Sequence, residues 1–163
     1  MEFTIEDVPW SAPDAVALRA AQRAEIAELY GTPDSEPGIA PSAADVPVFV
    51  VAYDPAGTPV ACGGLRPVDA ATGEVKRMYV APPARGTGAA AAVLAALEDR
   101  ARGRSWTRLS LETGHRQEAA IRFYARSGYT PAPPFAPYTD APDSLFFTRA
   151  LPAAREVRSA GGI

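Results

Sequence analysis

Two glycines at the start of a predicted helix are the residues of this sequence that most clearly indicate chemistry. The stretch A-R-G-T-G-A-A-A, from Ala84 to Ala91, follows an apolar segment and opens an alanine-rich one. Glycine permits positive φ and lets a ligand approach the backbone closely. Unpaired N–H groups at a helix N-terminus attract anions. The N–H groups from Gly86 to Ala90, beside the guanidinium of Arg85, therefore predict a site for a pyrophosphate.

Other interpretations of the glycines are a plain strand-to-helix turn, an ATP-binding loop and a dinucleotide-binding loop. The ATP loop is excluded because no Gly-Lys-Ser/Thr follows. The dinucleotide loop fits G-x-G-x-x-A at Gly86, Gly88 and Ala91, with Glu112 ending the next strand. Against it, residues 81–85 separate the strand from the first glycine, an antiparallel meander precedes it, and too little chain follows for a second half. It remains the weaker alternative.

The elements around this loop form a mixed α/β pattern with an antiparallel first half. A short strand is expected over Glu2–Val8. An amphipathic helix is expected over Ser11–Tyr30, with Val16, Leu18 and Leu29 among its apolar residues. In chain order, the further expected elements are strands at 47–53, 58–66 and 74–80, a helix at 88–102, a strand at 107–113, a helix at 117–127, and strand-like residues around 129 and over 145–151.

Composition limits the class of protein. A chain of 163 residues with 47% hydrophobic and 21% charged residues is typical of one globular domain. A net charge of −3 argues against binding nucleic acid through phosphate neutralisation. The single cysteine, Cys62, is expected to be a small buried hydrophobe, and the single histidine, His115, excludes a His-rich metal cluster. No apolar run suits a membrane helix and no signal peptide is evident, so we expect a cytoplasmic protein without a bound metal.

The glycine loop, with the segments around it, resembles a known family. R-G-T-G-A-A resembles the R/Q-x-x-G-x-G/A acetyl-CoA signature of the GNAT family of N-acetyltransferases. The segments V-K-R-M-Y-V, L-S-L-E-T and A-I-R-F-Y-A-R-S-G-Y are similar to that family's in type and order, and the resemblance covers roughly residues 48–151. It implies one α+β domain over residues 1–151, with a mixed, mostly antiparallel central sheet and helices on both faces. We expect residues 152–163 to form a flexible tail.

The resemblance also implies roles for individual residues, with acetyl-CoA as co-substrate. Tyr124 would face the thioester sulfur and protonate the leaving thiolate, although a plain core aromatic is the alternative. Glu74 would be the general base, with a solvated turn residue as the alternative. Gln117 or Glu118 would replace an asparagine that many members carry. The pantetheine arm would run beside Met78, Tyr79 and Val80, and the pyrophosphate would be held by the backbone of Arg85, Gly86, Thr87, Gly88, Ala89 and Ala90.

The acceptor would be a primary amine on a small molecule or a peptide. Glu112 could face its cavity, with a surface ion pair as the alternative. Tyr138, with Asp140 and Asp143, could recognise a cationic amine from a late loop that is otherwise an ordinary hairpin turn. His115 could serve as a base or be a solvated loop residue. A non-catalytic acyl-CoA sensor and a small dinucleotide-dependent oxidoreductase remain rival functions, and the sequence leaves open whether the chain forms a homodimer.

Overall fold

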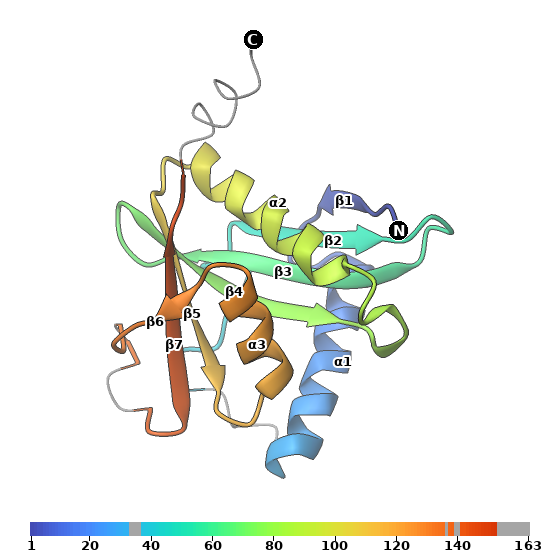
Figure 1. Ribbon diagram of the computed structural model, residues 1–163. Coiled ribbons are helices and arrows are strands. Elements are labelled where there is room, and N and C mark those ends of the chain that lie inside the picture. The colour runs from blue at the N-terminus through green and yellow to red at the C-terminus, as the bar shows by residue number, and fades with distance from the viewer. Residues whose placement is uncertain (33–36, 136, 139–140, 153–163) are drawn as a thin grey trace.

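The computed structural model describes residues 1–32, 37–135, 137–138 and 141–152 of the chain. In this part a seven-stranded sheet has the order β1-β2-β3-β4-β5-β7-β6 (Figure 1). Its strands are β1 (Thr4–Asp7), β2 (Val48–Tyr53), β3 (Pro59–Pro67), β4 (Thr72–Val80), β5 (Arg108–Gly114), β6 (Thr130–Pro131) and β7 (Ser144–Ala150). The helices are α1 (Pro13–Tyr30), α2 (Ala89–Gly103) and α3 (Glu118–Arg126), with a short 3₁₀ turn, η1 (Pro82–Ala84), before the glycine loop.

The sheet is mixed and mostly antiparallel, as the sequence predicts. Every neighbouring pair is antiparallel except β4 and β5, which run parallel. This arrangement confirms the expected fold class, and it differs from the parallel, doubly wound sheet that the dinucleotide interpretation requires. The tail from residue 153 onward lies outside the described residues.

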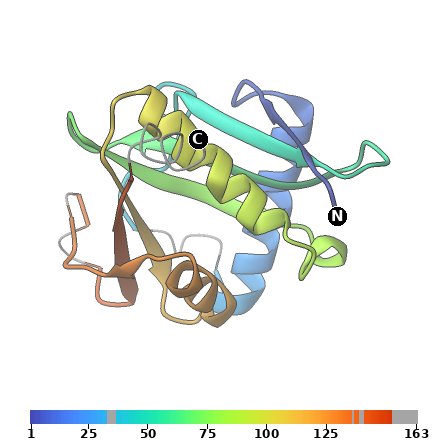
Figure 2. The same ribbon diagram turned by 45° about the horizontal axis from the view of Figure 1, so that its top comes forward.

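Helices cover both faces of the sheet. Successive side chains of a strand point to opposite faces, and in the central strands apolar residues occur at both kinds of position. Val48, Val50 and Ala52 of β2 belong to the core under α2 and α3, whereas Phe49 and Val51 pack with α1. Figure 2 shows α2 and α3 in front of the sheet and α1 behind it. The two helix layers leave the sheet's central strands buried on both sides.

The apolar face predicted for α1 is only partly correct. Leu18 is buried, but Val16 and Leu29 are 47% and 42% exposed. The apolar residues of α1 therefore do not all contribute to the core. None of the described helices is long and apolar enough to cross a membrane. A cytoplasmic location and a homodimer stay predictions.

The strands β4 and β5 separate soon after they begin, and this separation creates the candidate site. They pair over only three positions, from Thr72↔Arg108 to Glu74↔Ser110. Further along, β4 carries a bulge: the register with β3 shifts between Cys62 and Gly64, and Arg77 has φ 59°. A bulge bends a strand and increases its twist. Meanwhile β5 stays paired with β7 over its full length, so the ends of β4 and β5 diverge.

Candidate functional site

The loop before α2 has the backbone conformation that its two glycines predict. Gly86 and Gly88 have φ of 77° and 92°, and Gly88 is the N-cap of α2, with no side chain capping the helix. A Cβ added at either glycine would meet no atom within 4 Å. Glycine is thus required for conformation rather than for lack of room. The first N–H groups of α2 lie beside open space, where an anion can reach them.

A pocket lies between this loop and α3. Val80, Arg85, Gly86 and Gly88 to Ala91 line it on one side, and Phe123, Arg126 and Ser127 of α3 line it on the other. The guanidinium of Arg85 already has two partners within the protein. Its Nε donates to Val80 O (3.0 Å), and it forms an ion pair with Glu25 (2.7 Å). The hydroxyl of Thr87 donates to Ala84 O and holds the loop's shape.

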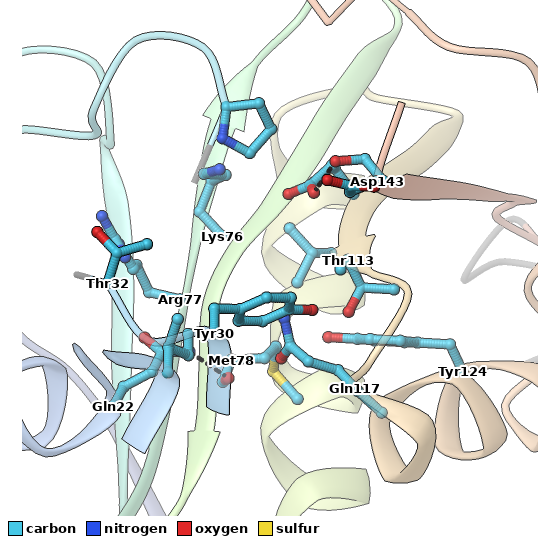
Figure 3. A pocket seen from close by; sticks show the side chains of 17 residues that line it. Gln22, Tyr30, Thr32, Lys76, Arg77, Met78, Thr113, Gln117, Tyr124 and Asp143 are labelled. Carbon is cyan, nitrogen blue, oxygen red and sulfur yellow. Dashed lines mark hydrogen bonds between the residues drawn. The ribbon is translucent and has the colours of Figure 1, made fainter. Parts of the chain in front are cut away.

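A second cavity, of about 340 Å³, lies where β4 and β5 diverge, and α1 closes one side of it (Figure 3). Met78, Glu112, Gln117, Tyr124 and Asp143, all singled out from the sequence, line this cavity. Tyr79 does not, because its ring packs on the opposite face of the sheet with α1. The cavity and the loop pocket share strand β4, with Met78 at one and Val80 at the other.

The backbone of β4 directs polar groups into this gap. Ala81 N–H donates to Val60 O (2.8 Å), and the register pairs Val80 with Ala61. Because outward and inward positions alternate in antiparallel pairs, the backbone groups of Val80 point away from β3. The Val80 carbonyl accepts from Arg85, and the Met78 carbonyl accepts from Gln22 Nε2 at 2.8 Å. By the same alternation the Val80 N–H points away from β3, where a ligand lying along β4 would meet it.

Tyr124 lies on α3 across the cavity from Met78 (Figure 3). It is 6% exposed and its ring packs against Phe123 and Tyr129, with centroids 5.3 and 5.8 Å away. Burial raises the pKa of its hydroxyl well above the ordinary value of 10.0. The residue is therefore both a core aromatic and a cavity residue, and it stays protonated at neutral pH.

The start of α3 also contributes to the cavity. Gln117 precedes the helix and lines the cavity, whereas Glu118, the alternative considered from the sequence, is exposed and does not. His115 is exposed and its Nδ1 lies 3.1 Å from the carbonyl of Asp143. It does not line the cavity. Of the two residues considered in place of the family's asparagine, Gln117 lines the cavity, and its role there stays a prediction.

The surroundings of Glu74 are neither those of a general base in the cavity nor those of a solvated turn residue. Its alternative as a solvated turn residue is wrong, because it is 2% exposed. Its carboxylate accepts from Arg66 (3.2 Å) and Tyr138 (2.6 Å) and lies 3.6 Å from Lys76 Nζ. Lys76 lines the cavity, but Glu74 does not. As a base, Glu74 could therefore reach the cavity only through its neighbours, and that role stays a prediction.

Tyr138 also belongs to a group that we call the ionic cluster: Arg66, Glu74, Lys76 and Tyr138, which are buried, and Asp45, which is half-buried at its edge. The Tyr138 ring is 1% exposed and does not line the cavity, and a role in recognising the amine stays a prediction. Burial and the Glu74 carboxylate raise its pKa to about 12, against the effect of Lys76. Asp140 lies outside the described residues.

The ionic cluster ties two loops to the sheet. Arg66 donates to Ile39 O (2.9 Å) and pairs with Asp45 (3.2 Å), and both acceptors lie in the segment between α1 and β2. A Cβ on Gly38 would lie only 2.7 Å from the Tyr138 ring, so the same segment packs tightly on the late loop. The cluster therefore fixes the wall at the end of the cavity away from the glycine loop.

A model of the acetyltransferase (GNAT) family matches residues 15–129. The chain belongs to this family. A Klebsiella pneumoniae structure assigned as an acyl-CoA N-acyltransferase is 35% identical, with a TM-score of 0.79 over 91% of this chain and 97% of that one. An Azospirillum brasilense IAA acetyltransferase is 41% identical over 58% of this chain, but the match spans only 63% of that relative. A GNAT structure from Elizabethkingia anophelis with acetyl-CoA bound has a TM-score of 0.65 at 16% identity, covering 91% and 98%.

Several residues around this GNAT site were not found from the sequence. Gln22, Ile26, Tyr30 and Thr32 line the cavity from α1 and the residues after it. Helical periodicity assigned α1 to the core, and nothing in a local pattern indicates that its second half passes the end of β4. Arg126 was missed because the sequence does not indicate which side of α3 approaches the glycine loop. In the described part of the chain no cluster of three or more His, Cys, Asp and Glu could hold a metal.

Proposed function

We propose that this chain transfers the acetyl group of acetyl-CoA to a primary amine, with both substrates bound together between β4 and β5. The observation that carries the proposal is the order of features along one strand. An anion-binding loop lies just beyond Val80, and a cavity that contains the Tyr124 hydroxyl surrounds Met78. Membership of the GNAT family supports the same reaction.

Coenzyme A fits the residues present. The positive φ of Gly86 and Gly88 and the open space beside both make room for phosphates at the N-terminus of α2. The N–H groups of Met78 and Val80 would pair with the pantetheine arm, much as a peptide strand adds to a sheet edge. When bound, acetyl-CoA supplies an activated acyl group. The binding of acetyl-CoA by a structural neighbour is consistent with this assignment.

The reaction forms a bond between the amine nitrogen and the acyl carbon and breaks the bond from that carbon to sulfur. The amine loses a proton to a base, and coenzyme A leaves as a thiolate that takes up a proton from solvent, so the products are an N-acetylated amine and coenzyme A. A backbone N–H of β4 near Met78 would stabilise negative charge on the acyl oxygen. Tyr124 would donate to the sulfur. Because its pKa is raised far above the value of roughly 8.5 for a thiol, we expect a hydrogen bond to the thiolate rather than complete proton transfer.

We weigh two carboxylates as acceptors of the amine proton, and assign Asp143, which also lines the cavity, to recognition of a cationic amine. Glu112 lines the cavity, and Ser144 Oγ donates to it (2.6 Å). Glu74 lies behind Lys76 and Tyr138 in the ionic cluster. We propose Glu112 as the acceptor because it requires no relay, and Glu74 as the alternative. Direct contact with the cavity is the property that separates them.

The experiment is a measurement of free coenzyme A release from acetyl-CoA in the presence of single amines. The panel contains benzylamine, spermidine, L-lysine, L-glutamate and a short peptide, and mass spectrometry identifies the acetylated product. Release that depends on an amine is the expected result. Tight binding of acetyl-CoA without turnover across the panel would instead favour a non-catalytic sensor. Binding of NADH with no binding of acetyl-CoA would favour the oxidoreductase.

A further inference from the structure

Arg126 is a cation of the loop pocket for which the described residues provide no partner. It lies in the last turn of α3, is exposed, and lines the pocket opposite Gly86 and Gly88. Within the described residues no hydrogen bond, ion pair or ring contact engages its guanidinium. The other arginine of this pocket, Arg85, is paired with Glu25 and with Val80 O.

This difference decides which side chain can give charge to a ligand in the pocket. The Arg85–Glu25 pair is close to neutral as a unit, and its guanidinium is already oriented by two acceptors within the protein. Turning it toward a phosphate would cost both contacts. Arg126 gives up no internal contact. A planar guanidinium that is free to rotate also suits the paired oxygens of a phosphate.

The position of Arg126 on α3 offers a second reason. The last turn of a helix presents carbonyl oxygens with partial negative charge, which repel an anion. The C-terminal turn of α3, with Phe123 and Ser127, forms one wall of the pocket that faces the N–H groups of α2. Without a cation on that turn, the wall would oppose phosphate binding. Arg126 is the basic residue of that turn.

We infer that Arg126 contacts the pyrophosphate of coenzyme A directly, and that Arg85 acts instead as a positioning residue that ties the loop to β4 and α1. This inference rests on the proposed function, because it takes coenzyme A as the ligand. Under this inference the backbone N–H groups of the loop bind the phosphates from the α2 side, and the Arg126 side chain binds them from the α3 side.

The test compares Arg126→Gln with Arg122→Gln by calorimetric titration with coenzyme A. Arg122 lies one turn earlier on α3, is also exposed, and lines neither pocket, so both variants remove the same charge from the same helix. Losing a charged hydrogen bond should weaken binding about tenfold in R126Q. R122Q should stay within about twofold, because salt screens distant charges. Equal affinities of the two variants would overturn the inference.

Dephospho-coenzyme A, which keeps the pyrophosphate but lacks the 3′-phosphate, identifies the group that Arg126 contacts. The loss in R126Q should be the same with this probe; a loss that disappears with it would place Arg126 on the 3′-phosphate and overturn the assignment. The double variant Arg85→Gln/Glu25→Gln removes the internal pair at constant net charge and should lower affinity clearly less than R126Q does, because it loosens the loop without removing a phosphate contact. A loss as large as that of R126Q would return the binding role to Arg85. If the wild-type protein binds neither probe, the proposed function itself fails.

Discussion

Replacing Gly88 with alanine should separate the loop's conformation from its binding role, because the chain contains a matched control. Gly57, in the turn between β2 and β3, has φ 83°, and Gly88 has φ 92°; a Cβ at either position would meet no atom within 4 Å. Alanine at positive φ costs roughly 1–2 kcal/mol. Each kcal/mol shifts Tm by about 2–4 °C in a domain of this size. Both variants should therefore melt about 2–8 °C below the wild type.

Only the Gly88 variant should lose affinity for acetyl-CoA. Its new methyl group would project into the open space beside the first N–H groups of α2, where we place the pyrophosphate. Loss of one hydrogen bond to a charged group costs about 1.5–3 kcal/mol, or roughly a tenfold to hundredfold rise in Kd. Differential scanning fluorimetry and calorimetric titration measure the two effects separately. If G88A and G57A bind acetyl-CoA equally well, the pyrophosphate does not lie on this loop and our reasoning about the glycines is wrong.

Three further predictions concern side chains. Tyr124→Phe should lower kcat about a hundredfold while the Kd for acetyl-CoA stays nearly unchanged, since only a donor to sulfur is lost; an unchanged kcat would exclude that role. Glu112→Gln should lower kcat about a hundredfold with little change in Tm. In Glu74→Gln the free energy of unfolding should fall by about 3–5 kcal/mol, because the substitution leaves buried cations unbalanced. A stable but inactive E74Q would instead make Glu74 the base. Cys62 is fully buried, which raises its pKa to about 12, so an Ellman-type reagent should modify it only after denaturant is added, and rapid labelling of native protein would contradict this burial.

The fold could be predicted from the sequence because its local signals agree with the tertiary structure. Strand β2 is an apolar run rich in valine, followed by a turn with Gly57, and α2 begins just after Gly88, where the glycines predicted it. The strand, loop and helix of the cofactor end are equally local, because they follow one another directly in the chain, from β4 (Thr72–Val80) to α2 (Ala89–Gly103). A pattern within one segment was enough to find it.

The acceptor end could not be predicted in the same way, because its residues meet only in three dimensions. Glu74 and Tyr138 are 64 positions apart, yet their oxygens lie 2.6 Å apart. Gln22 binds the carbonyl of Met78 across 56 positions. Each residue alone is consistent with a surface turn, a helix face or a hairpin. What decides their roles is the separation of β4 from β5, which no single segment encodes.

The bulge in β4 links the two ends of the site. Arg77 takes a positive φ that a non-glycine residue adopts at some cost, and contacts around it offset that cost. The Cys62 thiol donates to the Arg77 carbonyl (3.4 Å), and Gln22 donates to the next carbonyl along, that of Met78. On one side of this bulge the ionic cluster fixes β4 and the wall of the cavity; on the other, Val80 and Arg85 lead into the glycine loop. A strand without the bulge could continue its pairing with β5 and close the gap. The strained residue and the core contacts that hold it are therefore what keep the cavity and the loop pocket side by side along one strand.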